Sequence, residues 1–323
     1  MVSTPAPISL RISLTDRCQL RCLYCTPACG AEAHADAHMS TDEIVSFVRV
    51  AANAFGLSKV HLTGGEPLLR ADILPLVARL AQLPVGDLAL TTNGQRLAEL
   101  AQPLRQAGLG RANVSLDSLQ DRTFRAITRG GDVKLTLAGI AQARAAGLPV
   151  KINTVVMRGI NGAQVVDIAR WGLQNGCCVR FLELMPIGPA SGLFEKLYVP
   201  SAEVQDTLGK AFDLRPLPAA PGGTTRTFQA RDILGQNGAG GTIGFISSGS
   251  HPFCQGCRRL RLTASGRLIG CLGLGLGPSI KPLLHAMDGP RQGLLTDAIH
   301  AALNQKQAGG HFTTGKLMVE TGG

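Results

Sequence analysis

Short apolar runs alternate with stretches of helical period over the first 190 or so residues of the chain. Six runs have the length and composition of buried strands, at 8–14, 59–63, 88–92, 112–116, 150–156 and 179–184. Amphipathic stretches at about 40–56, 73–82, 95–107, 134–146 and 164–174 lie between them. Such alternation predicts parallel strands with right-handed crossovers. Six units are two short of a full eight-stranded barrel, so we expect an α/β fold with an incomplete, open (β/α)6 TIM-like barrel.

Polar and glycine-rich residues follow the predicted strands directly. They form the segments "TDRC", "TGGEP", "TTNG", "SLDS" and "ELMP". Any one of them reads as an ordinary turn. The loops after parallel strands gather on one rim of a barrel, where enzymes of this architecture place their chemistry. Five such segments in corresponding places therefore predict an active site on that rim.

The composition changes at about 216–241, where "PLPAAPGG" and "GQNGAGGTIG" are rich in proline and glycine. We expect a barrel over 1–215 and a smaller α+β extension over 216–323. The formal charge of +10 favours an anionic partner, although a generally basic proteome would give the same surplus. The N-terminus lacks the pattern of a signal peptide, and no apolar run is long enough to cross a bilayer. We therefore expect a cytoplasmic protein, in which clustered cysteines indicate metal binding or catalysis.

Three of the nine cysteines fall within eight residues, at Cys18, Cys22 and Cys25. Four thiolates would complete a tetrahedral zinc site or hold every iron of a cubane cluster, whereas three leave one metal position open for a ligand. The alternative is a zinc site completed by His34 or His38. The spacing argues against it, because zinc ribbons usually pair their thiols in two separate C-x2-C knuckles. Cys29 is expected to be incidental.

A second triad lies in the predicted extension, at Cys254, Cys257 and Cys271, and arginines are interleaved with it. Guanidinium groups bind phosphates through paired hydrogen bonds. The triad beside arginines therefore predicts a second open cluster next to a polyanionic substrate. The alternatives are a zinc knuckle completed by His251 and a solvated basic strand.

C-x3-C-x2-C after a strand, followed one strand later by "TGGEP", resembles the radical S-adenosylmethionine superfamily. With the second triad, "RISLTDRC", "LTTNG", "NVSLDS", "RLRLT" and a terminal "GG", the chain resembles the GTP 3′,8-cyclase family, the molybdenum cofactor biosynthesis protein A family, from about Ile8 to the terminus. The resemblance implies two 4Fe–4S clusters and S-adenosylmethionine. It also implies a 5′-deoxyadenosyl radical that abstracts the 3′ hydrogen of GTP, after which C3′ joins C8 of guanine to give (8S)-3′,8-cyclo-7,8-dihydroguanosine 5′-triphosphate.

The resemblance also implies roles for single residues. The first triad would hold the cofactor cluster and the second triad the substrate cluster. The S-adenosylmethionine site would be formed by Tyr24, Gly65, Ser115 and Met185. The GTP site would be formed by Arg11, His61, Thr91, Lys151, Arg259, Leu260 and Arg261. Arg259, Arg261 and the terminal Gly322 and Gly323 would take part in catalysis.

Three positions depart from the family pattern: His61 stands for an arginine, Thr26 for a methionine and Arg258 for a small polar residue. His61 is expected to weaken one phosphate contact or to make it pH-dependent. The departures leave open a divergent paralogue that modifies another nucleotide or a peptide. A zinc-stabilised nucleic-acid-binding protein is disfavoured by the scarcity of aromatic residues. Cys177 and Cys178 are expected to be ordinary buried thiols.

The resemblance implies partners as well. The product would pass to cyclic pyranopterin monophosphate synthase, and flavodoxin or ferredoxin would supply electrons. We expect neither nucleic acid nor a membrane as a partner, and a monomer or homodimer.

Overall fold

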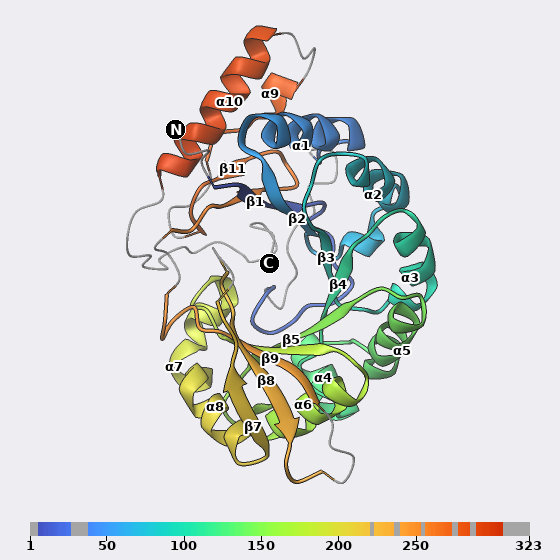
Figure 1. Ribbon diagram of the computed structural model, residues 1–323, viewed down its shortest axis with the longest axis vertical. Helices are drawn as coiled ribbons and strands as arrows, with labels where there is room; N and C mark the ends of the chain where they lie inside the picture. Colours follow the sequence, from blue (N-terminus) through green and yellow to red (C-terminus); the bar gives the residue numbers. More distant parts are fainter. Residues whose placement is uncertain are drawn as a thin grey trace.

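Eleven strands form one sheet in the computed structural model, which describes residues 6–26, 38–219, 223–235, 240–252, 256–272, 277–284 and 289–305. The strand order is β11-β10-β1-β2-β3-β4-β5-β6-β9-β8-β7. Figure 1 shows the first six strands following one another around the molecule, with their helices on the outside. This arrangement confirms the incomplete TIM-like barrel.

The six predicted strands are present as β1 (Ile8–Ser13), β2 (Leu57–Thr63), β3 (Leu88–Thr92), β4 (Arg111–Ser115), β5 (Val150–Val156) and β6 (Cys178–Glu183). The five predicted helices are α1 (Thr41–Phe55), α2 (Ile73–Ala81), α3 (Leu97–Gln106), α5 (Val133–Ala145) and α6 (Val165–Gln174). The sequence prediction missed α4 (Asp121–Thr128), which is short and buries Phe124 and Ile127. Helices α7 (Phe194–Leu197) and α8 (Ser201–Gly209) follow β6.

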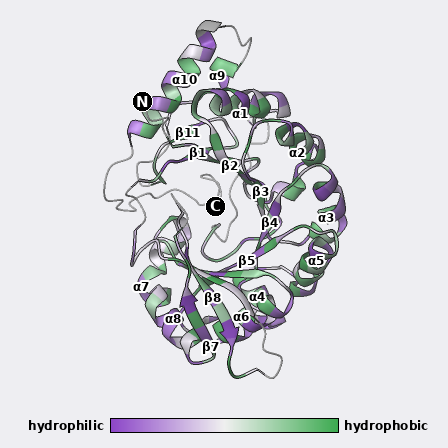
Figure 2. Cartoon of the chain, viewed as in Figure 1, coloured by the Kyte–Doolittle hydropathy of each residue, from purple (hydrophilic) through white to green (hydrophobic). Residues whose placement is uncertain are grey.

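Helix α1 shows how the sequence sets an element's ends. The Ser40 hydroxyl accepts from the Glu43 backbone N–H at 3.2 Å, and the Glu43 carboxylate accepts from the Ser40 N–H at 2.7 Å. This reciprocal pair is the predicted capping box. Gly56 follows the helix with a φ of 66°, a conformation that glycine adopts without strain. Figure 2 shows hydrophobic and hydrophilic residues mixed along the outer helices, as one buried and one exposed face require.

The C-terminal part occupies both free edges of the barrel sheet. It contains β7 (Phe212–Pro216), β8 (Arg226–Asp232), β9 (Gly240–Ile246), β10 (Arg259–Leu262), β11 (Leu268–Ile269), α9 (Lys281–Leu284) and α10 (Gly289–Asn304). Strand β9 pairs in parallel with β6, and β10 pairs in parallel with β1. Eight neighbouring strands are thus parallel, from β10 through β1–β6 to β9.

The sheet runs without interruption across the expected boundary at 215/216, so that division of the chain stays a prediction. Strands β9 and β10 are consecutive in the chain but lie on opposite sides of the six barrel strands. Helix α10 packs against α1, where His300 meets the Phe55 ring edge-on at 4.6 Å between centroids. In the part of the chain that is described, no helix combines the length and the apolar composition needed to span a membrane.

Candidate active site

The inner face of the barrel strands is polar. On β1, the residues Ile8, Leu10 and Ile12 are fully buried in the apolar core, so the alternate residue Arg11 lies on the opposite, inner face. The same alternation places further polar or charged residues on that face: Lys59, His61, Thr91, Arg111, Asn113, Ser115, Lys151, Asn153, Arg180, Arg259 and Arg261. Barrel interiors are usually filled with branched apolar side chains. A polar interior therefore indicates a binding site.

The first cysteine triad lies at the carboxyl end of β1, on the predicted rim. The Cys25 N–H donates to the Cys22 carbonyl at 2.9 Å, which closes the loop. The Cys18 sulfur accepts from the Leu20 N–H at 3.4 Å and from the Asn93 amide at 3.8 Å. Burial raises the pKa of Cys18 to about 12, and the neighbouring thiol of Cys25 acts in the same direction. The three thiols are therefore close enough to oppose one another's ionisation, and iron would have to displace their protons.

The zinc alternative for this triad finds no support in the described residues. His38 Nε2 is hydrogen-bonded to the Asp16 carboxylate at 2.9 Å, which engages that nitrogen. Within the described ranges, no three or more His, Cys, Asp or Glu side chains converge on a point that could hold one metal ion. A cubane cluster does not need such convergence, because each thiolate binds a different iron. His34 and Cys29 lie outside the described residues.

The TGGEP segment packs directly against the turn that precedes Cys18. The Gly65 N–H donates to the Thr15 carbonyl at 2.6 Å, and the Glu66 N–H donates to the Arg17 carbonyl at 2.7 Å. A Cβ on Gly65 would lie 2.2 Å from the Arg17 oxygen, so no other residue fits there without movement. The close approach of these two turns explains the glycine at this position.

The Glu66 carboxylate accepts three hydrogen bonds from neighbouring protein groups. It accepts from the Thr92 hydroxyl at 2.7 Å, from the Asn93 N–H at 2.8 Å and from the Leu68 N–H at 3.0 Å. Burial raises its pKa to about 7, although the hydrogen bonds oppose that rise. Glu66 therefore ties the rim segments after β2 and β3 together.

The other predicted cofactor residues follow the carboxyl ends of β1, β4 and β6. The Tyr24 hydroxyl donates to the Asp117 carboxylate at 2.7 Å, which links the cysteine loop to the end of β4. Ser115 ends β4 opposite Asn153, and Met185 follows β6. The Asn153 Oδ1 atom is buried and has no hydrogen-bond partner among the described residues. An unpaired buried acceptor next to Ser115 fits a ligand that carries an ammonium or hydroxyl group.

Arg11 lies at the centre of a row of basic residues. It stands in register with Arg261 on β10 and with His61 on β2. Burial, followed by the charges of Arg261 and Arg259, lowers the pKa of Arg11 well below its usual value. Burial and Arg259 lower the pKa of Arg261 to about 10. Arg11 Nε is also buried without a hydrogen-bond partner in the described structure, as is Arg180 Nε. Buried cations of this kind are costly unless an anion accompanies them.

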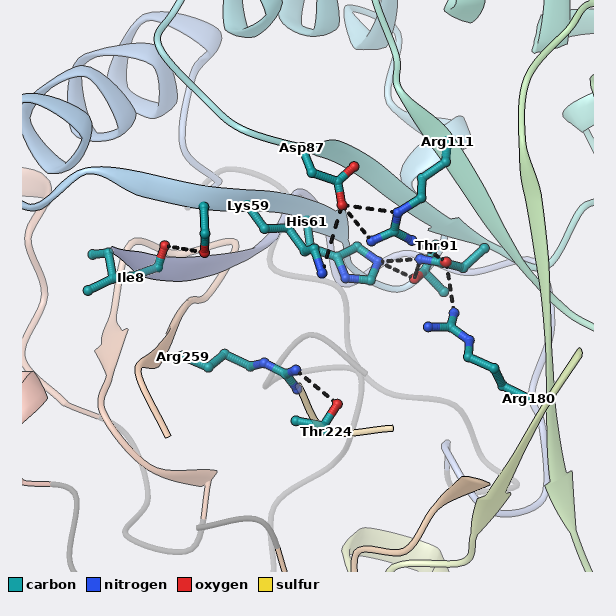
Figure 3. A network of polar contacts seen from close by, with 11 residues as sticks. Ile8, Lys59, His61, Asp87, Thr91, Arg111, Arg180, Thr224 and Arg259 are labelled. Carbon is teal, nitrogen blue, oxygen red and sulfur yellow. Dashed lines mark hydrogen bonds and ion pairs between the residues drawn. The ribbon is translucent and has the colours of Figure 1, made fainter. Parts of the chain in front are cut away.

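A second group of polar side chains surrounds His61 (Figure 3). Its Nε2 atom lies 2.6 Å from the Thr91 hydroxyl and 2.8 Å from the Asn113 amide nitrogen. The Asn113 oxygen accepts from Arg111 at 2.6 Å and from Arg180 at 2.8 Å. Burial, followed by the charge of Arg11, lowers the pKa of His61 well below its usual value. The lowered pKa argues against a contact that titrates near neutrality, and the weaker phosphate contact stays a prediction.

The second triad is described in part. Cys257 and Cys271 both act electrostatically on Arg261, so the thiols do lie beside the predicted arginines. The Arg259 guanidinium donates to the Thr224 hydroxyl at 3.3 Å (Figure 3), and Leu260 between the two arginines is fully buried. Cys254, Gly322 and Gly323 lie outside the described residues.

Sequence reasoning missed several inner-face residues: Lys59, Asp87, Arg111, Asn113 and Arg180. Asp87 pairs with Arg111 at 2.9 Å and with Lys59 at 3.8 Å (Figure 3). The sequence did contain a signal for two of them, because Arg111 and Arg180 alternate with apolar residues along their strands as Arg11 does. The prediction that Cys178 is an ordinary buried thiol was wrong. Only Cys177 is buried, whereas Cys178 is partly exposed and pairs in register with Lys151.

Comparison with known families agrees with this geometry. The Radical SAM superfamily matches residues 12–172, and the family described as Molybdenum Cofactor Synthesis C matches residues 177–312. A GTP 3′,8-cyclase from Geobacter sulfurreducens is 45% identical over 86% of this chain and 84% of its own length. One from Pelotomaculum thermopropionicum is 45% identical over 90% of this chain and 89% of its own length.

Solved structures confirm the fold. Streptococcus suis SuiB bound to S-adenosylmethionine superposes with a TM-score of 0.62, at 16% identity over 90% of this chain and 68% of that chain. SuiB bound to the precursor peptide SuiA gives the same TM-score over 89% of this chain and 66% of that chain. At such low identity these likenesses concern the fold alone. The family assignment rests on the sequence relatives, and on their evidence the chain belongs to the radical S-adenosylmethionine family of GTP 3′,8-cyclases.

Proposed function

We propose that this chain converts GTP into (8S)-3′,8-cyclo-7,8-dihydroguanosine 5′-triphosphate, the first step of molybdenum cofactor biosynthesis. The observation that carries the proposal is the cationic inner face of the barrel, together with a three-thiol loop at the carboxyl end of β1 and two further thiols beside Arg261. A substrate with a triphosphate matches the buried arginines, and its base and ribose would extend from them toward the thiols.

Cys18, Cys22 and Cys25 would hold the first 4Fe–4S cluster. Tyr24, Gly65, Ser115 and Met185 would form the site for S-adenosylmethionine. When bound, the cluster and S-adenosylmethionine supply the 5′-deoxyadenosyl radical that takes the 3′ hydrogen of the ribose. The chain's own part is to keep the rim fixed, through Glu66 and through the Tyr24–Asp117 hydrogen bond. A fixed rim holds the reacting atoms in place.

Arg11, His61, Thr91, Lys151 and the β10 residues Arg259, Leu260 and Arg261 would bind GTP. Burial lowers the pKa values of Arg11, Lys151, Arg259 and Arg261, which means that their charged forms are poorly solvated. Bound phosphates would supply the missing counter-charge. The same reasoning adds Arg180, whose Nε has no partner among the described residues, to the proposed site.

Cys254, Cys257 and Cys271 would hold the second 4Fe–4S cluster, with Arg259 and Arg261 beside the substrate. Gly322 and Gly323 are proposed to complete the site. We further propose a cytoplasmic enzyme, monomeric or homodimeric, that receives electrons from flavodoxin or ferredoxin and passes its product to cyclic pyranopterin monophosphate synthase.

The test is an anaerobic assay of the reconstituted protein with dithionite, S-adenosylmethionine and GTP, in which 5′-deoxyadenosine and the cyclised nucleotide are quantified by mass spectrometry. We expect both products, and we expect the nucleotide product to require GTP. Cys22→Ser should abolish both. Cys271→Ser should keep some cofactor cleavage and lose the nucleotide product. Cys177→Ser changes a buried thiol outside the triads and should keep both activities.

Two outcomes would contradict the proposal in different ways. Cleavage of S-adenosylmethionine without a GTP product, by protein with about eight irons per chain, would retain the radical chemistry and point to another substrate. No cleavage at that iron content would reject the assignment as a whole.

A further inference from the structure

Asn113 lies at the centre of the polar network on the inner face. It is the middle residue of β4, and its side chain is fully buried. Its oxygen accepts two hydrogen bonds, from Arg111 and from Arg180, and its nitrogen faces His61 Nε2 at 2.8 Å. One neutral side chain thus connects residues from β2, β4 and β6.

The two arginines fix which way the Asn113 amide points. A guanidinium group can only donate hydrogen bonds. Rotating the amide by half a turn would place its NH2 group against both guanidinium groups and leave those donors facing a donor. The oxygen must therefore face Arg111 and Arg180, and the NH2 group must face His61.

This orientation decides where the His61 proton lies. A donor at 2.8 Å requires an acceptor, so Nε2 must carry its lone pair. The Thr91 hydroxyl can then donate to the same lone pair, at 2.6 Å. The single proton of the ring is left on Nδ1, which makes no hydrogen bond to any residue in the described ranges. A second proton on Nε2 would collide with the Asn113 NH2 group.

We infer that Asn113 is a positioning residue that keeps His61 neutral, with Nδ1–H as the donor offered to an anion in the barrel. The phosphate identity of that anion rests on the proposed function, whereas the position of the proton does not. Charges on four other strands of the sheet also lower the pKa of His61: Arg11 on β1, Arg111 on β4, Arg180 on β6 and Arg259 on β10. Asp87 is paired with Arg111 and Lys59, and so does not supply His61 with a carboxylate of its own.

The direct test is nuclear magnetic resonance of the full chain, with 15N-labelled histidine and oxidised, reconstituted clusters; His61→Gln assigns the His61 signals. We expect a protonated Nδ1, an unprotonated Nε2 and no titration of the ring between about pH 6 and pH 8. A protonated Nε2, or a ring that titrates near its ordinary pKa, overturns the inference. This measurement needs no variant of Asn113.

Asn113→Asp replaces the NH2 donor that faces His61 with an acceptor oxygen, at nearly the same side-chain volume. One carboxylate oxygen would still accept hydrogen bonds from the two arginines. The other oxygen could only accept a hydrogen bond from His61, so Nε2 would have to carry a proton. We expect the variant to raise the pKa of His61 by about 2 and to move its proton onto Nε2. Thr91→Val is the matched control: it removes the other neighbour of Nε2 but keeps Asn113, so His61 should stay neutral. An unchanged His61 in Asn113→Asp would contradict the inference.

Binding of GTP separates this inference from the proposed function. The ratio of the GTP Kd of the wild type to that of His61→Gln should stay constant between about pH 6 and pH 8, because neither side chain titrates there. The ratio also cancels the titration of the nucleotide itself. A ratio that follows protonation of a histidine would overturn the inference. Absence of GTP binding with the expected His61 spectrum would instead reject the substrate and leave the positioning role of Asn113 intact.

Discussion

At the scale of single residues, Gly65 occupies the point where the TGGEP turn touches the turn before Cys18. A Cβ there would lie 2.2 Å from the Arg17 oxygen, which is backbone and cannot rotate away. We expect Gly65→Ala to separate the two turns, to destabilise the protein by about 1–3 kcal/mol and to weaken retention of iron by the first triad. Urea unfolding and iron content per chain measure the two effects.

The control is Gly209→Ala at the end of α8, where an added Cβ would meet nothing within 4 Å. Its stability should stay within about 0.5 kcal/mol of the wild type, and its iron content should be unchanged. Equal behaviour of the two variants would show that the contact at Gly65 is not needed.

Some residues of the candidate site could be predicted from the sequence and others could not. Cysteine spacing and the alternation of Arg11 and Lys151 with apolar residues marked their positions in the sequence. Asn113 is the first residue of the "NVSLDS" motif, but the motif gave it no role of its own, because a small polar residue on a strand is common. Its importance arises from contacts with Arg111 and Arg180, of which Arg180 is 67 residues away along the chain. The tautomer of His61 follows from those contacts and could not have been predicted from its ordinary pKa.

At the scale of elements, Glu183 holds together the end of β6, the start of α8 and the loop after β9. Its carboxylate accepts from the backbone N–H groups of Ser201 at 2.7 Å, Gly249 at 2.8 Å and Ser250 at 2.9 Å, and from the Ser250 hydroxyl. Burial raises its pKa, but the hydrogen bonds outweigh burial, and the net pKa lies below the ordinary 4.5. The resulting stabilisation is therefore fully present above about pH 4.5 and is lost as the pH falls through the lowered pKa.

We expect Glu183→Gln to destabilise the protein by about 2 kcal/mol at neutral pH, because an amide NH2 group would face backbone donors. The difference from the wild type should shrink as the pH falls from about 4.5 through the lowered pKa of Glu183, where the wild-type carboxylate becomes protonated. Urea unfolding of the iron-free wild type and of Glu183→Gln, from neutral pH down to acidic pH, measures this difference in stability. Glu203→Gln breaks an exposed pair with Arg158 and should lower the free energy of unfolding much less than Glu183→Gln does. A loss of stability in Glu183→Gln that does not change with pH would contradict the role of the Glu183 charge.

The elements themselves were predictable where the pattern is local. Strands β1–β6 and their long helices follow from periodicity and from caps such as Ser40. The pairing of β10 with β1 does not, because β10 has four residues and its partner lies some 250 positions earlier. The sequence suggested a separate extension, whereas the free edges of an open barrel sheet require partners that its C-terminal strands provide.

At the scale of the whole molecule, these edge pairings predict that the barrel segment is not self-sufficient. Removal of residues 216–323 would strip β9 from β6 and β10 from β1, and would expose Phe181, whose ring packs 6.3 Å from that of Phe245. We expect residues 1–215 alone to aggregate or to lack cooperative unfolding and near-ultraviolet circular dichroism. Co-expression of residues 216–323 is the matched rescue, and it should restore both. Cooperative unfolding of the isolated barrel segment, with a denaturant dependence appropriate to its length, would establish instead that the chain divides into two independent domains at 215/216.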